Sequence, residues 1–210
     1  CSAVARALGL PALQTVQARQ YTVPLLQAWT DTDIWLSNDY PGGYGWLFPK
    51  ARMANLGLGM DRGASELKRL LDALHRRLVD EGRVGDAIVY RTGGAIPVGG
   101  LRARLVLGNV MFAGDAAGLT HPITGAGIAA AIASGERAGE AAARWLTGGE
   151  RDALAAFEED MRDQFGPTLR RALERRQQLV RRRGGDRGAD ADAIHRRGWI
   201  AFPEYFESMA

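Results

Sequence analysis

The chain has 210 residues, of which 46% are hydrophobic and 24% are charged, and this balance is typical of a globular protein with a real core. It contains one cysteine, Cys1, which excludes an intrachain disulfide framework and a cysteine-based metal site. Its three histidines, His75, His121 and His195, have no metal-ligand spacing, and no apolar run is long enough to span a bilayer, so we expect neither a metal site nor a transmembrane helix.

The first 85 residues predict a short helix, an antiparallel sheet and a longer helix. Residues 2–9 have helical composition and end at Gly9. Between residues 15 and 60, short runs of aromatic and branched residues are separated by Pro, Gly, Asn and Asp, which is the pattern of an antiparallel sheet. Residues 65–81 carry a leucine stripe at helical spacing, which predicts a helix packed on a core (Leu67, Leu70, Leu71, Leu74 and Leu78).

The rest of the chain predicts extended structure followed by long helices. Residues 87–100 return to extended structure, and residues 105–115 are interpreted as one buried strand that ends at Asp115. A long alanine-rich helix follows over 125–146, and further helical structure is predicted from about 151 to 183. Residues 184–192 are polar and predict a loose turn, and the aromatic stretch 198–206 closes the chain as a cap. The fold class is therefore α+β.

The net charge of +3 is unevenly distributed. The stretch from Arg170 to Arg197 holds ten arginines against four acids, a local charge of +6, so the remainder of the chain carries about −3. Such a stretch can meet phosphates, anionic lipid or an acidic partner, or it can be an ordinary solvated helix face. Nucleic acid is not expected, because the arginines lack interleaved aromatic residues.

The residue types around Asp115 indicate a ligand-binding site. A strand followed by Gly-Asp and a glycine-rich turn would bring a carboxylate to the edge of a sheet, where it can accept hydrogen bonds from a polyol. Gly125 and Gly127 would let the backbone approach a flat ring, and the following helix start would present unpaired N–H groups to an electron-rich ring atom. A polyol-linked, electron-accepting ring such as flavin fits this description, although Asp115 could also be a simple capping residue.

The full pattern G-D-A-A-G-x-x-x-P-x-x-G-x-G-I resembles the second FAD fingerprint of the flavoprotein reductase and hydroxylase superfamily, which includes para-hydroxybenzoate hydroxylase-like enzymes. In that superfamily the Asp contacts the ribityl chain, and the Pro and Gly segment lies against the isoalloxazine. The resemblance therefore implies a set of FAD-binding residues (Gly114, Asp115, Pro122, Gly125, Ala126, Gly127 and Ile128).

Two further motifs resemble those of the geranylgeranyl reductase family. One is Y-x-W-x-F-P-K, formed here by "YGWLFPK" at 44–50, and the other is Y-x8-G-G, formed by "YRTGGAIPVGG" at 90–100. In the family these segments line the cavity that receives an isoprenoid chain, and strand alternation would put the three aromatic side chains of the first motif on one face. The resemblance implies a set of substrate-binding residues (Tyr44, Trp46, Phe48, Tyr90, Gly99 and Gly100). The alternative for the aromatic stripe is ordinary sheet core.

The resemblance also predicts a domain organisation. Residues 1–14 would end one segment of an FAD domain, 15–104 would form the substrate-binding domain, 105–148 would return to the FAD domain, and 149–210 would form a C-terminal helical segment. The sequence has no G-x-G-x-x-G loop for the FAD pyrophosphate, so we expect the chain to be the C-terminal part of a larger flavoenzyme.

The activity that the resemblance implies is FAD-dependent reduction of carbon–carbon double bonds in an isoprenoid, with NADPH or ferredoxin as the electron donor. His121 and Tyr44 are candidate proton donors, and a structural hydrogen bond is the alternative role for His121. The basic stretch would place a cytoplasmic protein against a membrane surface. The competing hypotheses are a flavin monooxygenase or halogenase of the same superfamily, and a non-catalytic fragment that binds lipid.

Overall fold

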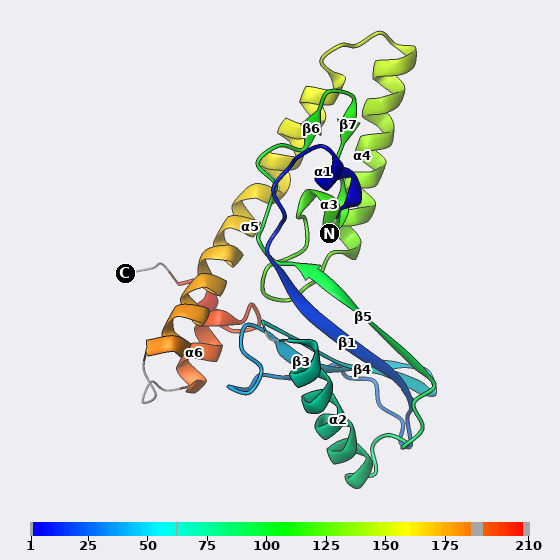
Figure 1. The fold of residues 1–210 in the computed structure, drawn as a ribbon, viewed down its shortest axis with the longest axis vertical. Helices are drawn as coiled ribbons and strands as arrows, with labels where there is room; N and C mark the ends of the chain where they lie inside the picture. Colours follow the sequence, from blue (N-terminus) through cyan, green and yellow to red (C-terminus); the bar gives the residue numbers. More distant parts are fainter. Residues whose placement is uncertain (1, 62, 186–190, 208–210) are drawn as a thin grey trace. The chain divides into compact units, whose positions relative to one another are not determined.

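The computed structural model describes residues 2–61, 63–185 and 191–207. It confirms the α+β class, with an antiparallel sheet and several long helices (Figure 1). The chain divides into two compact units, which are described separately below. Unit 1 comprises Cys1–Thr15, Ile96–Gln178 and Arg196–Ala210, and unit 2 comprises Val16–Ala95 and Leu179–His195.

Unit 2 is built on an antiparallel sheet whose strands lie in the order β2-β3-β4-β1-β5. The strands are β1 (Thr15–Pro24), β2 (Asp33–Trp35), β3 (Tyr44–Lys50), β4 (Met53–Met60) and β5 (Tyr90–Pro97). The helix α2 (Ala64–Asp80) lies along one face of this sheet (Figure 1). The strands predicted over residues 15–60 and the helix predicted over 65–81 are thus confirmed.

The core of unit 2 follows from two periodicities. The leucine stripe of α2 is buried except for the partly buried Leu70, and it packs against alternate residues of β1, β3 and β4, since successive side chains of a strand point to opposite faces of the sheet. Tyr21, Leu47, Leu58 and Met60 are such strand residues, each at most 2% exposed. The residues between them form the other face of the sheet, which carries the aromatic motif.

Unit 1 is mainly helical. Its elements are α1 (Ala3–Ala7), the two-stranded β6 (Val106–Leu107) and β7 (Val110–Met111), α3 (Gly114–Ala117), α4 (Ile128–Thr147) and the first part of α5 (Ala153–Gly185). The helix α6 (Ala191–Gly198) is divided between the units, since unit 2 extends to His195 and unit 1 resumes at Arg196, and the 3-10 turn η1 (Pro203–Tyr205) of unit 1 follows it. Its main core packs Phe112, Leu119, Phe157 and Met161 together. A smaller cluster buries Tyr205 against Ile123, which places part of the predicted aromatic cap.

One sequence prediction was wrong. Residues 105–115 do not form a single buried strand, because Gly108 takes a positive φ of 60° and reverses the chain between β6 and β7. Two-residue turns with glycine at the first position are common in hairpins. Both short strands are only half-buried, and Asp115 lies in the helical turn α3 instead of at a strand end. The loose turn predicted at 184–192 lies largely outside the described residues.

Candidate functional site

The Asp115 segment is a tight sequence of turns in unit 1. The turn α3 begins at Gly114, whose φ is +51°, and ends at Gly118 in the left-handed region. The buried N–H of Gly114 donates to Ser134 Oγ on α4 at 3.0 Å. Asp115 itself is exposed, and its Oδ1 accepts a hydrogen bond from Thr120 Oγ1 at 2.7 Å. The carboxylate is therefore held by one oxygen while the side chain stays accessible to a ligand.

A second turn fixes His121. The N–H of Thr124 donates to His121 Nδ1 at 3.2 Å, so the neutral ring carries its proton on Nε2. That Nε2 is buried, and no described residue forms a hydrogen bond with it. Burial lowers the pKa of His121, which favours the neutral ring. The turn thus holds a donor N–H that lacks an acceptor, and a buried donor without a partner calls for an explanation.

The start of α4 completes this arrangement. Gly127 is its N-cap and provides no side-chain cap, so the first N–H groups of this 20-residue helix have no capping side chain from that position. A Cβ at Gly127 would lie 3.3 Å from both Asp115 Oδ1 and Thr120 Oγ1, closer than most side chains allow. Glycine here keeps open the space between the carboxylate and the helix start.

The predicted cofactor residues occupy different environments in this segment. Ala126 and Ile128 are exposed, and Gly125 turns the chain with a φ of +68°. Pro122 is buried, and its carbonyl accepts a hydrogen bond from the buried Arg176. In the structure Pro122 therefore helps to anchor the turn, and a contact between its ring and a flavin stays a prediction.

These residues fit a flavin. The exposed Asp115 carboxylate could accept hydrogen bonds from polyol hydroxyls, and the start of α4 could face an electron-rich ring edge. The Nε2–H of His121 could donate to a ring nitrogen or carbonyl, which would remove the unpartnered donor. A flavin supplies hydroxyls, acceptors and a flat ring in one molecule.

Three supporting residues were missed by sequence reasoning. Arg102 is buried and clamps α3, since its Nε donates to the Ala116 carbonyl at 2.8 Å and its Nη1 to the Pro11 carbonyl. Ser134 is fully buried and holds Gly114, and Arg176 holds Pro122. A signal existed only for Ser134, as a polar residue on the inward face of an alanine-rich helix.

The aromatic motif lies on unit 2, on the face of the sheet opposite α2. The rings of Tyr44 and Trp46 are 5.5 Å apart, and those of Trp46 and Phe48 are 5.9 Å apart and nearly parallel. Trp46 is 8% exposed, and its Nε1 donates to Gln20 Oε1 at 3.2 Å. Its ring lies flat over its cross-strand partner Gly57. The alternation predicted for β3 is confirmed, and it produces a continuous aromatic row.

The two parts of the Y-x8-G-G motif fall in different units. Tyr90 is 63% exposed at the start of β5, and by alternation it lies on the sheet face opposite Arg91, whose guanidinium covers the ring of Tyr21 on the α2 face. Gly99 and Gly100 belong to unit 1. A Cβ at Gly118 would come 2.1 Å from the Gly100 carbonyl oxygen, so Gly100 packs against the Asp115 segment, whereas a Cβ at Gly99 would meet Gln14. Their predicted role in substrate binding remains a prediction.

Comparisons with known proteins match both the region of the aromatic motif and the region of the Asp115 segment. A family model described as "Geranylgeranyl reductase catalytic domain" matches residues 14–95, and one described as "Lycopene cyclase protein" matches residues 61–182, more than half of the chain. Digeranylgeranylglycerophospholipid reductases from Methanocella arvoryzae and Methanothrix thermoacetophila are 36% and 35% identical to it, over 65% and 71% of the chain. The chain belongs to the geranylgeranyl reductase family of FAD-dependent oxidoreductases.

Solved structures show how far the fold of this geranylgeranyl reductase family member is shared. A geranylgeranyl bacteriochlorophyll reductase-like protein from Thermoplasma acidophilum superposes with a TM-score of 0.69 at 26% identity, covering 86% of this chain and 50% of that one. A flavin-dependent halogenase from Xanthomonas campestris gives a TM-score of 0.62 at 14% identity, with 99% and 43% covered. A p-nitrophenol 4-monooxygenase from Pseudomonas putida gives 0.58 at 16%, with 93% and 53% covered. These last two likenesses concern the fold alone.

The family and its flavin-dependent structural neighbours imply FAD as the cofactor. The chain spans less than two fifths of the length of the two curated geranylgeranyl reductase relatives named above, 36% and 39% respectively. None of the helices in the described part of the chain combines the length and hydropathy that crossing a bilayer requires.

Proposed function

We propose that this chain is the part of an FAD-dependent reductase that faces the flavin and holds the substrate, and that the whole protein reduces carbon–carbon double bonds in the isoprenoid chains of a lipid. The observation that carries the proposal is that one chain holds both a turn with an accessible carboxylate and an unpartnered buried donor, and a sheet face with a continuous aromatic row. Relatives named digeranylgeranylglycerophospholipid reductase support a prenyl-lipid substrate.

FAD, when bound, supplies hydride chemistry, which no protein side chain provides. Asp115 would accept hydrogen bonds from the ribityl hydroxyls and so fix the position of the ring. The start of α4 and the Nε2–H of His121 would donate to the electron-rich edge of the ring. His121 therefore serves as a hydrogen-bond donor in this proposal, because its lowered pKa leaves it without a second proton to give.

The aromatic row would hold the hydrocarbon chain and exclude water from it. Burial raises the pKa of Tyr44 to about 12, so its Oη is protonated at all physiological pH values. Tyr44 lies at one end of the row, and it is the residue we assign to deliver a proton to the second alkene carbon. NADPH or ferredoxin would supply the electrons that reduce the flavin.

Membrane contact through the basic stretch is part of the proposal, but the structure reduces the number of arginines that can take part. Arg175 and Arg176 are buried, and they donate to backbone carbonyls of unit 1. Arg170, Arg171 and Arg197 are exposed and would be available to anionic lipid. Vesicle binding that does not respond to anionic lipid content or to salt would contradict this part.

The test is a titration of FAD into the chain and into the whole protein, followed by flavin absorbance and fluorescence. Asp115→Ala in the whole protein should weaken FAD binding by about tenfold or more while the unfolding temperature of the flavin-free protein stays within a few degrees. The matched control is Asp152→Ala, which removes an exposed carboxylate elsewhere in unit 1. Wild-type flavin content in Asp115→Ala would refute the assignment of the half-site.

Turnover then separates the reductase from its alternatives. With a chemically reduced flavin and no oxygen, a digeranylgeranyl lipid should gain two hydrogen atoms per double bond, which mass spectrometry measures directly. Oxygen consumption with a hydroxylated or halogenated product would instead favour the monooxygenase or halogenase. Lipid binding by the whole protein without any flavin binding would favour the non-catalytic alternative.

A further inference from the structure

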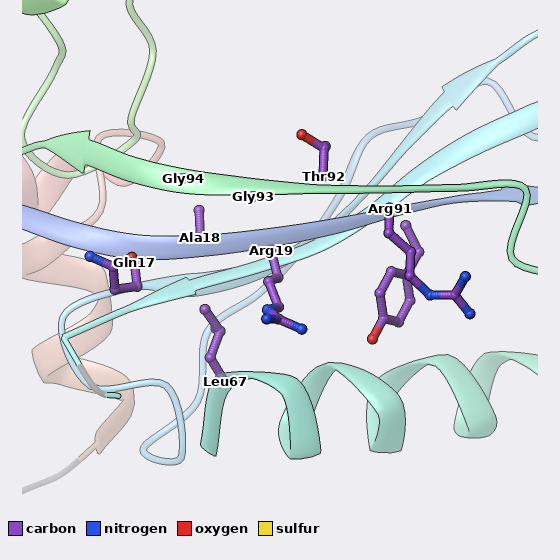
Figure 2. A pocket seen from close by; sticks show the side chains of 9 residues that line it. Gln17, Ala18, Arg19, Leu67, Arg91, Thr92, Gly93 and Gly94 are labelled. Carbon is purple, nitrogen blue, oxygen red and sulfur yellow. The ribbon is translucent and has the colours of Figure 1, made fainter. Parts of the chain in front are cut away.

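A pocket of about 410 Å³ lies on the α2 side of the sheet, at the edge formed by β5 (Figure 2). Its walls are β1, β5 and the first turn of α2 at Leu67. The aromatic row lies on the other face, since Gln20, which accepts from Trp46, alternates with Arg19 and Tyr21 along β1. The pocket is thus separate from the surface assigned to the isoprenoid.

Two guanidinium groups line the pocket. Figure 2 shows Arg19 on β1 and Arg91 on β5, with both side chains on the side of the sheet where α2 lies. Arg91 covers the ring of Tyr21, with its Cζ 5.7 Å from the ring centroid. No ion pair of either guanidinium occurs among the residues that the structure describes. Both positive charges are therefore available to a ligand.

Asp72, an acidic residue near the pocket, already accepts two hydrogen bonds. Asp72 accepts from the Tyr21 hydroxyl at 2.7 Å and from Lys68 Nζ at 2.6 Å. These two hydrogen bonds offset its desolvation and lower the pKa of Asp72 below its ordinary value. Leu67 is flanked on α2 by Glu66 and Lys68, so this end of the helix adds one charge of each sign. The two arginines set the local electrostatic balance, and it is positive.

The rest of the wall suits an oxyanion. Gln17 adds a side-chain amide, and β5 is the edge strand of the described sheet, so alternate backbone N–H groups have no strand partner. Gly93 and Gly94 place no side chain between that edge and the pocket. A Cβ at Gly93 would lie 2.6 Å from the Ala18 carbonyl oxygen, so close pairing of β5 with β1 requires glycine there.

We propose that this pocket binds a phosphate-bearing anion, whose oxygens are held by the Arg19 and Arg91 guanidiniums. Guanidinium groups match the geometry of phosphate oxygens and donate two parallel hydrogen bonds to them. Two sources share this chemistry, a small soluble phosphate compound and the head group of a phospholipid. The site lies on the opposite sheet face from the aromatic row and needs no flavin, so it does not rest on the proposed reductase function.

The test uses the chain itself and NMR titrations that follow the backbone amide and arginine Nε–H signals. The probes are inorganic phosphate and glycerol 1-phosphate, and vesicles of phosphatidylcholine with and without phosphatidylglycerol form the lipid arm in a sedimentation assay. Arg19→Gln and Arg91→Gln should each weaken binding by about tenfold or more. The matched control is Arg69→Gln, which removes the same charge from an exposed position on α2 outside the pocket.

The outcomes are distinct. Saturable shifts with the soluble probes that depend on Arg19 and Arg91 support a site for a small phosphate compound, and vesicle binding with the same dependence supports a lipid head group. Equal weakening by Arg69→Gln would mean diffuse electrostatic attraction and would overturn the proposal, as would the absence of saturable binding by every probe. Arg91→Lys keeps the positive charge but lacks the two parallel N–H donors of a guanidinium group. It should bind the phosphate probes with intermediate affinity, provided that circular dichroism shows native folding.

Discussion

Gly57→Ala is expected to displace Trp46 and destabilise the sheet of unit 2. Gly57 lies directly opposite Trp46 on the neighbouring strand, and an added Cβ would lie 2.1 Å from two atoms of the indole ring. The ring would have to leave a nearly fully buried position, and its hydrogen bond to Gln20 would break. Overpacking costs about 1–3 kcal/mol and the lost hydrogen bond about 0.5–1.5 kcal/mol, so we expect a loss of about 1.5–4.5 kcal/mol in the free energy of unfolding.

The matched control is Gly59→Ala, two residues along the same strand and on the same face. A Cβ there would lie 3.6 Å from the nearest atom of Trp46, which is an ordinary contact. Gly59→Ala should change the free energy of unfolding by no more than about 0.5 kcal/mol. A slight stabilisation is also consistent, because alanine loses less backbone freedom on folding than glycine. Urea denaturation measures both variants, and near-ultraviolet circular dichroism reports the ring environment. Equal free energies of unfolding for the two variants would refute the reasoning.

Three further predictions concern the buried Ser134 and two residues of the aromatic row. Ser134→Ala leaves the buried Gly114 N–H without its acceptor and should cost about 1–3 kcal/mol in urea denaturation, whereas the same change at the exposed Ser65 should cost less than about 0.5 kcal/mol. Burial raises the pKa of Tyr44 to about 12 from 10.0, so its contribution to the free energy of unfolding is complete below pH 10 and falls as the pH rises towards 12. Tyr44→Phe should therefore show a smaller loss of stability over that range, and an unchanged alkaline profile would contradict the burial effect. In the whole protein, Trp46→Ala should reduce turnover of a prenyl lipid much more than FAD content, and equal losses of both would identify Trp46 as a core residue only.

Most of the helices and strands that the sequence could predict follow from the local periodicity of apolar residues. The leucine stripe of residues 65–81 and the alternation of residues 44–48 each concern neighbours along one element, and both are confirmed. The prediction over 105–115 was wrong because apolar residues on both sides of Gly108 look like one continuous strand, although the turn residue is present in the sequence. A two-residue reversal leaves the apolar pattern almost unchanged, so periodicity alone could not detect it.

The supports of the Asp115 segment could not be predicted for a different reason. Arg102 donates to Pro11, 91 residues away, and Ser134 accepts from Gly114 across 20 residues. Such hydrogen bonds leave no periodic trace, since they depend on which elements meet in the folded chain. The same holds for Arg175 and Arg176, which belong to a stretch that charge counting interprets as surface but which unit 1 uses to hold backbone carbonyls.

His121 shows why a ligand is the better explanation of this segment. A buried donor without a partner costs about 1–3 kcal/mol, and the turn that holds it is otherwise fully used, with Nδ1 bonded to Thr124 and the backbone bonded to Ala126. If the turn served stability alone, a smaller apolar side chain would fold without that cost. An acceptor brought by a ligand would recover the same energy on binding, and it would do so beside the exposed Asp115 carboxylate and the uncapped start of α4. His121 therefore lowers the stability of the ligand-free chain. The same residue should make the segment bind a flavin more tightly than a ligand that has no hydrogen-bond acceptor on a ring.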